Sequence, residues 1–511
     1  MTATGSSGSS LCENACNLRE GMALLAMRRS QLGRKAIDTY LIIIKINQEA
    51  VVKLEKRSIE FVPHSERYGT PRRLFTIWFS SNFQVTALMV GTLGIASGLS
   101  FGWTLLGLLI GNLVGTVFMA AHSAQGPHLG VPQMIQSRAQ FGVYGAAIPL
   151  LVMVTAAVLF LAASGVLMRD ALKALVPMSD DQAIVVVGIL TFIIGFIGYE
   201  LIHRMGAWMS LLSTLVFASA LALILLHPSD AASTTVSGTG FTLAAFNLVI
   251  AQAASWTLGY GPYVADYSRY LPANVSTRAT FWTTYCGCAL GSFAMMALGA
   301  LLAVAIPAAL ERDPATAIAM LFGPWAPLVL GVIALGVIQY NVLCLYSAYM
   351  SSVTIFGAFG GLKYVTAPAK ALVMAILTVA ATLIAIATQY RFDTFFADIL
   401  IGQLYLLIPW SAINLVDYYW VCRGHYEVGD LYAPKGRYAR FNGRTLMVYA
   451  VSIIGTIPFM KLSFYTGFVA NWLGADISWA MGLVLAGGLY CAVNSRPVVR
   501  SSRMFGQRSL E

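Results

Sequence analysis

Long apolar stretches recur along the chain, separated by short segments in which the polar residues gather. Each stretch has about 20 residues, the length that an α-helix needs to cross the hydrocarbon core of a bilayer. The apolar runs are continuous rather than alternating, which excludes a transmembrane β-barrel. The pattern predicts about twelve membrane-spanning helices, over residues 74–97, 103–120, 144–167, 183–199, 207–226, 243–264, 280–306, 327–355, 371–388, 396–417, 446–461 and 477–493.

The composition assigns the chain to the integral membrane proteins. It has 511 residues, of which 58% are hydrophobic and 11% charged, and its mean hydropathy is +0.72. A soluble protein needs more polar surface than this. No soluble domain fits between the spans, so we expect residues 61–495 to form a single transmembrane unit. Residues 1–60 are predicted to be a disordered, basic cytoplasmic extension, and residues 496–511 a cytoplasmic tail.

The net charge of +10 reports membrane topology and not a nucleic-acid partner. If the N-terminus is placed in the cytoplasm, nearly all of the 32 Lys and Arg residues fall in inward loops. The outward loops then hold only Arg169, Lys173, Arg312, Arg391 and Lys461. This is the positive-inside asymmetry of a multi-pass protein. We therefore expect a protein of the cell (cytoplasmic or plasma) membrane with both termini in the cytoplasm.

Two of the predicted spans carry polar and helix-breaking residues near their middle. The first, WFSSNFQVTALMVGTLGIASG (78–98), holds two serines, an asparagine and a glutamine before its glycines. The sixth, within WTLGYGPYVADYSRYLP (256–272), is interrupted at Gly259 and at Gly261-Pro262. Such pairing predicts inverted repeats whose broken helices meet in mid-membrane, where free backbone is tolerated only beside a cavity or ligand. Glycine used for close packing or for a simple kink is the alternative.

Five stretches of unusual sequence carry a family resemblance. They are ERYGTPRRLFTIWFSSN (66–82), GVPQMIQSRAQFGVYGA (130–146), WTLGYGPYVADYSRYLP (256–272), NVLCLYSAYMSS (341–352) and PWSAINLVDYYWVCRGHYEVGDLY (409–432). Together they resemble the nucleobase–cation symporters, most closely the purine and cytosine permease branch, in colinear order over residues 55–495.

This resemblance implies an all-α fold of two inverted five-helix repeats, like the bacterial leucine transporter, plus two C-terminal helices. It also implies symport of a nucleobase or related heterocycle, such as cytosine, a purine, allantoin or hydantoin, by alternating access and without a cofactor. The driving ion is H⁺ or Na⁺. Because the cargo is flat and uncharged, its site needs aromatic faces and hydrogen-bonding groups around the edge of the ring.

The resemblance also places the substrate-binding residues. Phe160 stands where the family usually has a stacking tryptophan, and Ser164 where an amide commonly meets the ring edge. In the eighth span Asn341 is retained, whereas Cys344 replaces a second asparagine, and a thiol is a weak hydrogen-bonding group. The predicted site residues are Phe160, Ser164, Trp256, Thr257, Tyr260, Asn341, Asn82 and Gln84. Asp266 and Arg269 are expected to seat the inner end of the sixth span rather than to touch substrate.

The coupling ion is the least determined part of this interpretation. The family's sodium sites draw oxygen ligands from the first and eighth helices. Here residues 331–340 have only Gln339 and Tyr340 as polar side chains, which favours protons over sodium. No carboxylate lies clearly in mid-membrane, since Asp398 and Asp417 fall near span ends, where solvated or capping roles are expected.

Two other functions were weighed against heterocycle symport. An amino-acid/cation symporter of the same fold would hold a carboxylate at a broken-helix N-terminus, which suits the aromatic, amide-rich residues less well. An enzyme would need clustered catalytic side chains. The six histidines instead occupy loops or span ends without pairing, and the seven cysteines show no metal-binding spacing. We therefore expect neither an enzyme nor a bound metal.

Overall fold

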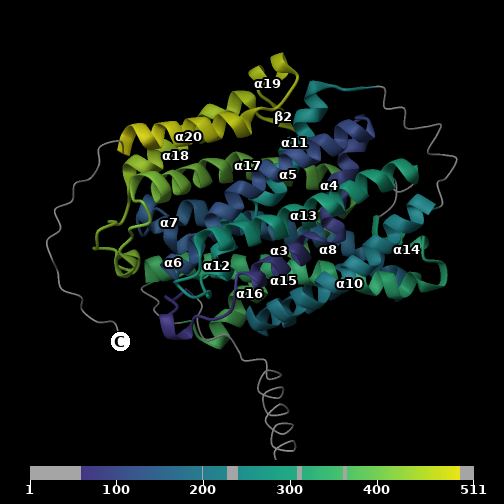
Figure 1. Ribbon diagram of the computed structural model, residues 1–511, viewed down its shortest axis with the longest axis horizontal. Coiled ribbons are helices and arrows are strands. Elements are labelled where there is room, and N and C mark those ends of the chain that lie inside the picture. The colour runs from purple at the N-terminus through teal and green to yellow at the C-terminus, as the bar shows by residue number, and fades with distance from the viewer. Residues whose placement is uncertain (1–58, 198, 227–239, 308–313, 361–364, 495–511) are drawn as a thin grey trace, which may run out of the picture. The chain divides into compact units, whose positions relative to one another are not determined.

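The structure, a computed structural model, describes residues 59–197, 199–226, 240–307, 314–360 and 365–494. The described residues belong to one compact unit, Glu55–Glu511, built almost entirely of helices (Figure 1). The predictions for the N-terminal extension, apart from residues 59 and 60, and for the C-terminal tail lie outside the described residues.

The first five predicted spans form helices, with two short helices in the connection between the second and third spans. The elements are η1 (His64–Glu66), α3 (Arg72–Asn82), α4 (Val85–Ala96), α5 (Phe101–Ser123), α6 (Gly126–Leu129), α7 (Gln133–Phe141), α8 (Ala147–Leu175), α9 (Asp180–Ile197) and α10 (Tyr199–Leu226). The segment 121–142, expected to be a loop, is thus largely helical, and α7 is amphiphilic and buried rather than exposed.

The second half of the chain repeats this order and then adds two further spans. Its elements are α11 (Leu243–Leu258), η3 (Gly261–Tyr263), α12 (Val264–Ser268), α13 (Thr277–Ala305), α14 (Pro314–Met320), η5 (Gly323–Trp325), α15 (Ala326–Gly360), α16 (Ala367–Thr388), η6 (Gln389–Arg391), α17 (Phe392–Val416), the π-helical η7 (Asp417–Val421), η8 (Val428–Tyr432), α18 (Gly443–Thr456), η9 (Ile457–Phe459), β1 (Lys461–Leu462), β2 (Tyr465–Thr466), α19 (Phe468–Leu473) and α20 (Ser478–Asn494).

Every predicted span coincides with a helix or with a broken pair of helices. Within the described residues, eight helical segments are long and apolar enough to cross a membrane. The other predicted spans correspond to the shorter helices α4, α11, α18 and α20. Helices α4 and α11 are short because their spans are interrupted, as the two predicted breaks require.

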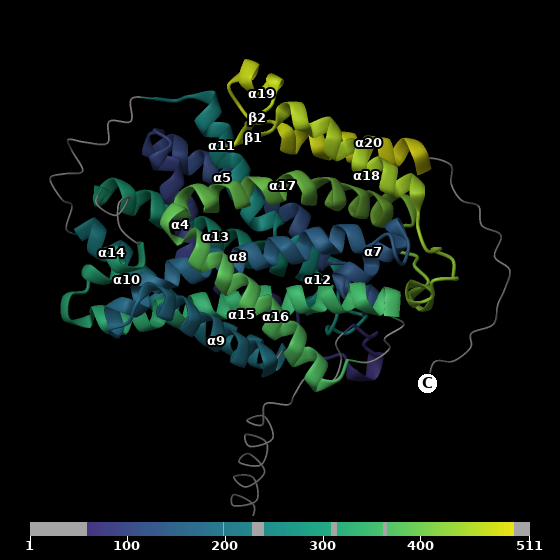
Figure 2. The same cartoon turned by 180° about the vertical axis from the view of Figure 1, so that it is seen from behind.

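The helices that matter for the site surround α8. It packs against α15 on one side and α17 on the other, which is followed most easily in Figure 2. On the far side of α17 lie α18 and α20, the two spans added after the repeats (Figure 1). The first and sixth spans reach the same region, because α11 contacts α4 in addition to packing on α5 and α17.

A stripe of glycines lets α5 approach α11 closely. Gly107, Gly111 and Gly115 recur every fourth residue, so they share one face of α5. A Cβ atom on Gly115 would lie 2.2 Å from Thr257 Oγ1 and 2.4 Å from the Ala254 carbonyl oxygen. Small residues at such spacing bring helix backbones together where lipid supplies no hydrophobic driving force.

Replacing Gly115 with alanine is therefore expected to destabilise the protein by about 1–3 kcal/mol, the usual cost of overpacking. The measurement is the melting temperature of the purified protein in detergent. Gly102 is the matched control, because a Cβ atom there would meet nothing within 4 Å among the described residues of the same helix and its neighbours. An equal loss of stability in Gly102→Ala and Gly115→Ala would contradict the packing role.

Candidate functional site

The first span breaks between α3 and α4, and polar side chains on both sides of the break bond to nearby backbone. Asn82 Nδ2 donates to the Trp78 carbonyl at 2.7 Å, and Ser81 Oγ donates to the Ile77 carbonyl at 2.5 Å. Gln84 is the N-cap of α4, where its Oε1 accepts from the Thr86 N–H at 2.6 Å. The Thr86 N–H freed at the break is thus capped locally, and the expectation that the remaining backbone there faces a ligand stays a prediction.

The sixth span breaks after Leu258. Gly259 N–H donates to the Ser255 carbonyl at 2.8 Å and closes α11, and the chain continues as a single 3₁₀ turn. Pro262 has no N–H group to continue the helix at that point. The side chain of Gln403, on α17, donates to the same Ser255 carbonyl at 3.1 Å. An amide from another helix thus lies directly beside this break.

The two breaks meet, as predicted. Trp256 Nε1 donates to Asn82 Oδ1 at 2.7 Å, and the Tyr260 hydroxyl donates to the Ser81 carbonyl at 3.5 Å. The Trp78 ring packs edge to face on Tyr260, with 5.4 Å between the ring centroids. Edge-to-face aromatic pairs contribute stability beyond that gained by burying the rings. These contacts therefore hold the first and sixth spans together at their breaks.

A small cavity lies next to the sixth break, between α8, α11, η3, α15 and α17. Its volume is about 20 Å³, which is room for about one water molecule. The residues that line it are Met153, Ala156, Ala157, Phe160, Trp256, Gly259, Tyr260, Tyr263, Tyr340, Cys344, Gln403 and Leu407. Most of the side chains that line the cavity are buried, and a guest larger than a water molecule requires the aromatic rings to move apart.

The lining is aromatic and uncharged, with one amide. Trp256 stacks on Tyr340, with 5.6 Å between ring centroids and an angle of 15° between the planes. Phe160 meets Trp256 edge to face at 6.1 Å. A Cβ atom on Gly259 would lie 3.1 Å from Gln403 Oε1, so the glycine keeps space open beside this oxygen. Flat apolar faces with a single polar group suit a planar, uncharged ring.

Three of the eight predicted site residues line this cavity, namely Phe160, Trp256 and Tyr260. They come from the third span and from the sixth break. Two neighbours that the sequence analysis did not select, Tyr340 and Gln403, line it as well. Gln403 carried a usable signal, because an amide inside an apolar span is a functional candidate by default.

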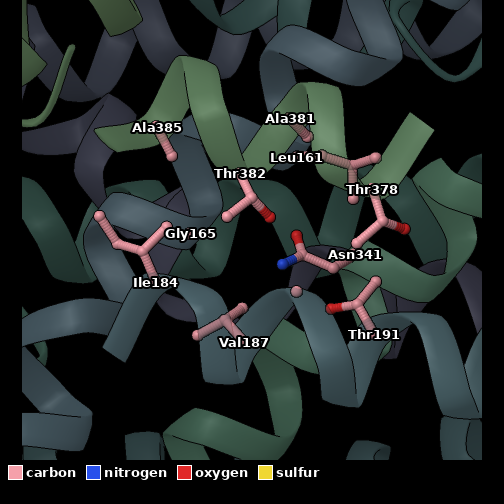
Figure 3. Close-up of a pocket in the computed structure, with 11 residues that line it drawn as sticks. Leu161, Gly165, Ile184, Val187, Thr191, Asn341, Thr378, Ala381, Thr382 and Ala385 are labelled. Carbon is pink, nitrogen blue, oxygen red and sulfur yellow. The ribbon is translucent and has the colours of Figure 1, made fainter. Parts of the chain in front are cut away.

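Asn341 lies elsewhere. It points into a second cavity, of about 20 Å³, between α8, α9, α15 and α16 (Figure 3). Its side chain is surrounded there by Thr191, Thr378 and Thr382 (Figure 3). Adjacent residues of a helix are about 100° apart, so Tyr340 on the same helix faces the first cavity and Asn341 does not. The predicted place of Asn341 beside the aromatic residues is therefore corrected.

The other four predicted residues do not line the cavity. Asn82 accepts the indole N–H of Trp256, and Gln84 caps α4. Thr257 Oγ1 donates to the Ala254 carbonyl at 3.2 Å and faces Gly115 of α5. Ser164 is fully buried one turn beyond Phe160, and its hydroxyl has no hydrogen-bond partner among the described residues.

The charged residues that follow the sixth break seat its end, as expected. The carboxylate of Asp266, on α12, accepts the backbone N–H of Gln133, at the start of α7, at 2.8 Å. The Arg269 guanidinium donates to the carbonyl oxygens of Asp266 and Glu60. Both side chains are buried. We call this part of the bundle, which carries α6, α7 and α12, the α6–α7 end.

The two carboxylates near the ends of α17 differ in burial and in hydrogen-bond partners. Asp398 accepts from the backbone N–H of Ser463, in the turn between β1 and β2, at 3.0 Å, so it caps a backbone group as expected. Asp417 is 4% exposed and accepts from Gln140 Nε2 at 2.8 Å, the Tyr426 hydroxyl at 2.6 Å and the Tyr490 hydroxyl at 2.8 Å. The expectation of a solvated or capping Asp417 is wrong, because three side-chain donors from other elements enclose it.

Comparison with known proteins places the chain in a family. The sequence profile described as permease for cytosine/purines, uracil, thiamine, allantoin matches residues 61–482. YxlA of Bacillus subtilis (strain 168), which carries a provisional name as a purine-cytosine permease, is 39% identical over 440 residues, covering 86% of this chain and 95% of YxlA. The purine-cytosine permease fcyB of Emericella nidulans is 25% identical over 480 residues, covering 89% of this chain and 90% of fcyB.

The fold has a counterpart among solved structures. Mhp1, a nucleobase-cation-symport-1 family transporter solved in a closed conformation with bromovinylhydantoin bound, superposes with a TM-score of 0.69. The match covers 89% of this chain and 98% of Mhp1 at 18% sequence identity. The predicted fold, an all-α membrane protein of inverted five-helix repeats with broken first and sixth spans, is confirmed.

Proposed function

Because the chain belongs to the family of permeases for cytosine, purines, uracil, thiamine and allantoin, we propose that it imports a nucleobase or related heterocycle by cation-driven symport. The family is one of transporters and not of enzymes. The protein crosses the membrane several times. The positive-inside distribution of Lys and Arg supports a cytoplasmic α6–α7 end and cytoplasmic termini in the cell membrane.

The observation that carries the proposal is the aromatic cavity at the sixth break. Phe160 and Trp256 supply the faces for stacking, and Gln403, whose Nε2 donates to Ser255, supplies its Oε1 as an acceptor for the ring edge. The cavity is lined by no Asp, Glu, Lys or Arg residue. A broken-helix N-terminus could hold the carboxylate of a free amino acid without a charged side chain, so it is the aromatic faces and the single amide that favour an uncharged ring as cargo.

The bound state requires a rearrangement of the aromatic rings. The cavity admits about one water, and Phe160 stands at 80° to Trp256. A heterocycle can enter when Phe160 turns and its face becomes parallel to the indole, so that the cargo stacks between the two. Trp256 keeps its place during this change because its Nε1 is held by Asn82 at 2.7 Å.

For the coupling ion, the contact between α3 and α15 supports protons. Gln339 Nε2 donates to Ser80 Oγ at 2.9 Å, so an amide N–H group lies where the first and eighth spans touch. Sodium needs oxygen ligands and is disfavoured by a neighbouring N–H donor. The sequence of α15 offers no serine or threonine between Ala326 and Tyr340 to replace it.

The test is uptake by proteoliposomes containing the purified protein. Cytosine, adenine, hypoxanthine, uracil, allantoin and hydantoin are offered with an inward proton gradient, with an inward sodium gradient, and with neither. We expect accumulation of at least one heterocycle with the proton gradient. No uptake of any of the six, or uptake that a gradient does not drive, would refute the proposal.

The Cys344 side chain is expected to set which heterocycle is preferred. It lines the cavity one turn after Tyr340, and it offers only a weak hydrogen bond. Cys344→Asn adds a donor and an acceptor, so the ratio of affinities for two heterocycles should shift by about 10-fold, equivalent to one edge hydrogen bond. Competition uptake measures the ratio. Cys344→Ala is the control and should keep the wild-type order of preference; an unchanged order in Cys344→Asn would exclude this role.

A further inference from the structure

A buried histidine lies beside the sixth break, next to η3, and does not line the aromatic cavity. His122, near the end of α5, has no exposed surface. Its Nε2 is 2.8 Å from Ser411 Oγ, and its ring stacks on Trp410 at 4.8 Å, both residues of α17. A Cβ atom on Gly261 would lie 3.3 Å from His122 Cδ2, so η3 passes directly over the imidazole.

The other imidazole nitrogen belongs to a chain of amides. Gln133 Nε2, on α7, is 3.2 Å from His122 Nδ1 and 3.4 Å from Gln125 Oε1. Gln125 Nε2 donates to Asn414 Oδ1 at 3.1 Å, and Asn414 Nδ2 donates to Gln140 Oε1 at 3.3 Å. Gln140 Nε2 then donates to Asp417 Oδ2 at 2.8 Å. A continuous hydrogen-bonded path, here called the amide chain, thus joins His122 to Asp417.

All members of the amide chain point the same way. Each amide nitrogen donates toward Asp417, as expected for dipoles that face a carboxylate. The Gln133 amide N–H therefore donates to Nδ1 of His122. In the neutral imidazole the hydrogen is then on Nε2, which donates to Ser411 Oγ. Gln133 Oε1 is buried and has no partner among the described residues. The Gln133 side chain therefore has an acceptor oxygen near His122 that makes no hydrogen bond with the described residues.

We propose that His122 is the site where the coupling proton binds, and that the amide chain links its protonation to the opening of the α6–α7 end. The inference rests on the proposed function, since it assigns the proton step of the same transport cycle. The proton enters from the outer solution through the cavity and past η3, binds His122 Nδ1, and leaves to the cytoplasm from the same atom. One positive charge moves per cycle: the Nδ1–H bond forms when the proton is taken up and breaks when it is released, and no other covalent bond changes.

The geometry explains why protonation would open this end. A proton on Nδ1 meets the donor face of the Gln133 amide, and two donors cannot pair. If the amide turns to present Oε1, its contact with Gln125 Oε1 becomes one between two acceptors. Either change breaks the amide chain, which ties α7 to α5 and α17 below the sixth break. A transporter that has bound both its cargo and the proton therefore opens at the cytoplasmic, α6–α7 end.

The charged groups around the amide chain are fixed by other contacts. Asp266, on α12, accepts the backbone N–H of Gln133, and Arg269 donates to backbone carbonyls. Arg138, on α7, donates to the carbonyls of Leu431 and Thr354; burial lowers the pKa of Arg138 to about 10, so it remains charged at neutral pH. Asp417 is enclosed by tyrosine and glutamine donors. In this network His122 contributes the basic ring nitrogen, the atom that can accept a proton and make the side chain a cation.

His122→Gln separates coupling from transport. In proteoliposomes with radiolabelled cytosine, or hypoxanthine if the wild type prefers it, the variant should lose proton-driven accumulation by about 10-fold or more, the size of a typical coupling free energy. Exchange of labelled against unlabelled base across the membrane needs no net proton movement and should persist. His128→Gln is the matched control: His128 is exposed, bonds Thr277 and lies six residues further on.

The outcomes are distinct. Undiminished accumulation in His122→Gln overturns the inference while leaving the proposed function intact. A wild type that neither accumulates nor exchanges any heterocycle overturns the proposed function and the inference with it. If His122→Gln does not fold, Gln133→Leu decides, because it keeps His122 and removes the donor that favours the neutral imidazole. Its proton-driven uptake should extend to higher pH than that of the wild type; an identical pH profile overturns the inference.

Discussion

Replacing Trp256 with alanine is expected to weaken heterocycle binding by about 10- to 100-fold, because stacking on an aromatic side chain contributes about 1–3 kcal/mol per base. The indole is 2% exposed, lines the cavity and stacks on Tyr340. Its loss removes one face of the proposed site and frees Asn82 Oδ1 from its donor. Binding is measured by ligand-induced thermal stabilisation, which yields the Kd for each variant.

Two further variants give this experiment its controls. Trp256→Phe keeps an aromatic face but lacks the N–H that donates to Asn82, so its affinity should fall between those of the wild type and Trp256→Ala. Trp282, on α13, is 56% exposed on the surface of the bundle, and Trp282→Ala should bind like the wild type. Equal affinity of Trp256→Ala and the wild type would remove Trp256 from the site.

The second large effect is expected at Gln403. Gln403→Leu should lower the affinity for cytosine by about 10- to 100-fold, since a buried polar edge left without a partner costs about 1–3 kcal/mol. Gln403 is the amide that lines the cavity, and its Nε2 is anchored on Ser255 while its Oε1 lies beside Gly259. This arrangement presents an acceptor to an N–H or NH₂ group of the ring.

An analogue of cytosine without the exocyclic amine provides the check on this contact. The wild type should bind cytosine more tightly than the analogue, whereas Gln403→Leu should bind the two with similar affinity. A preference that survives in Gln403→Leu would show that another group reads the amine. Gln182→Leu, at the exposed start of α9, controls for a general effect of losing an amide.

The breaks could be predicted because their causes are local. Glycine and proline at 259–262 interrupt the sixth span wherever the rest of the chain lies, and the serines, asparagine and glutamine at 80–84 provide capping groups beside the first break. Their meeting followed from the inverted-repeat arrangement. The role of the polar residues around the first break could not be predicted in this way, because the same side chains can cap a helix end or bind a ligand.

The orientation of the long helices was beyond a sequence argument. Tyr340, Asn341 and Cys344 lie within five residues of α15, and a rotation of about 100° per residue decides which of them faces which cavity. That rotation is fixed by the packing of α15 against α8 and α9 over its whole length. The amide chain was equally hidden, because it joins residues of α5, α7 and α17 that are nearly 300 positions apart, such as Gln125 and Asn414.

The central claim is that the cargo binds at the sixth break, between Phe160 and Trp256. A structure of the protein with its heterocycle bound tests this most directly. The account predicts a ring stacked between these two side chains, with its edge toward Gln403 and with Asn341 outside contact distance. A ring found beside Asn341, in the cavity between α8, α9, α15 and α16 (Figure 3), would contradict it.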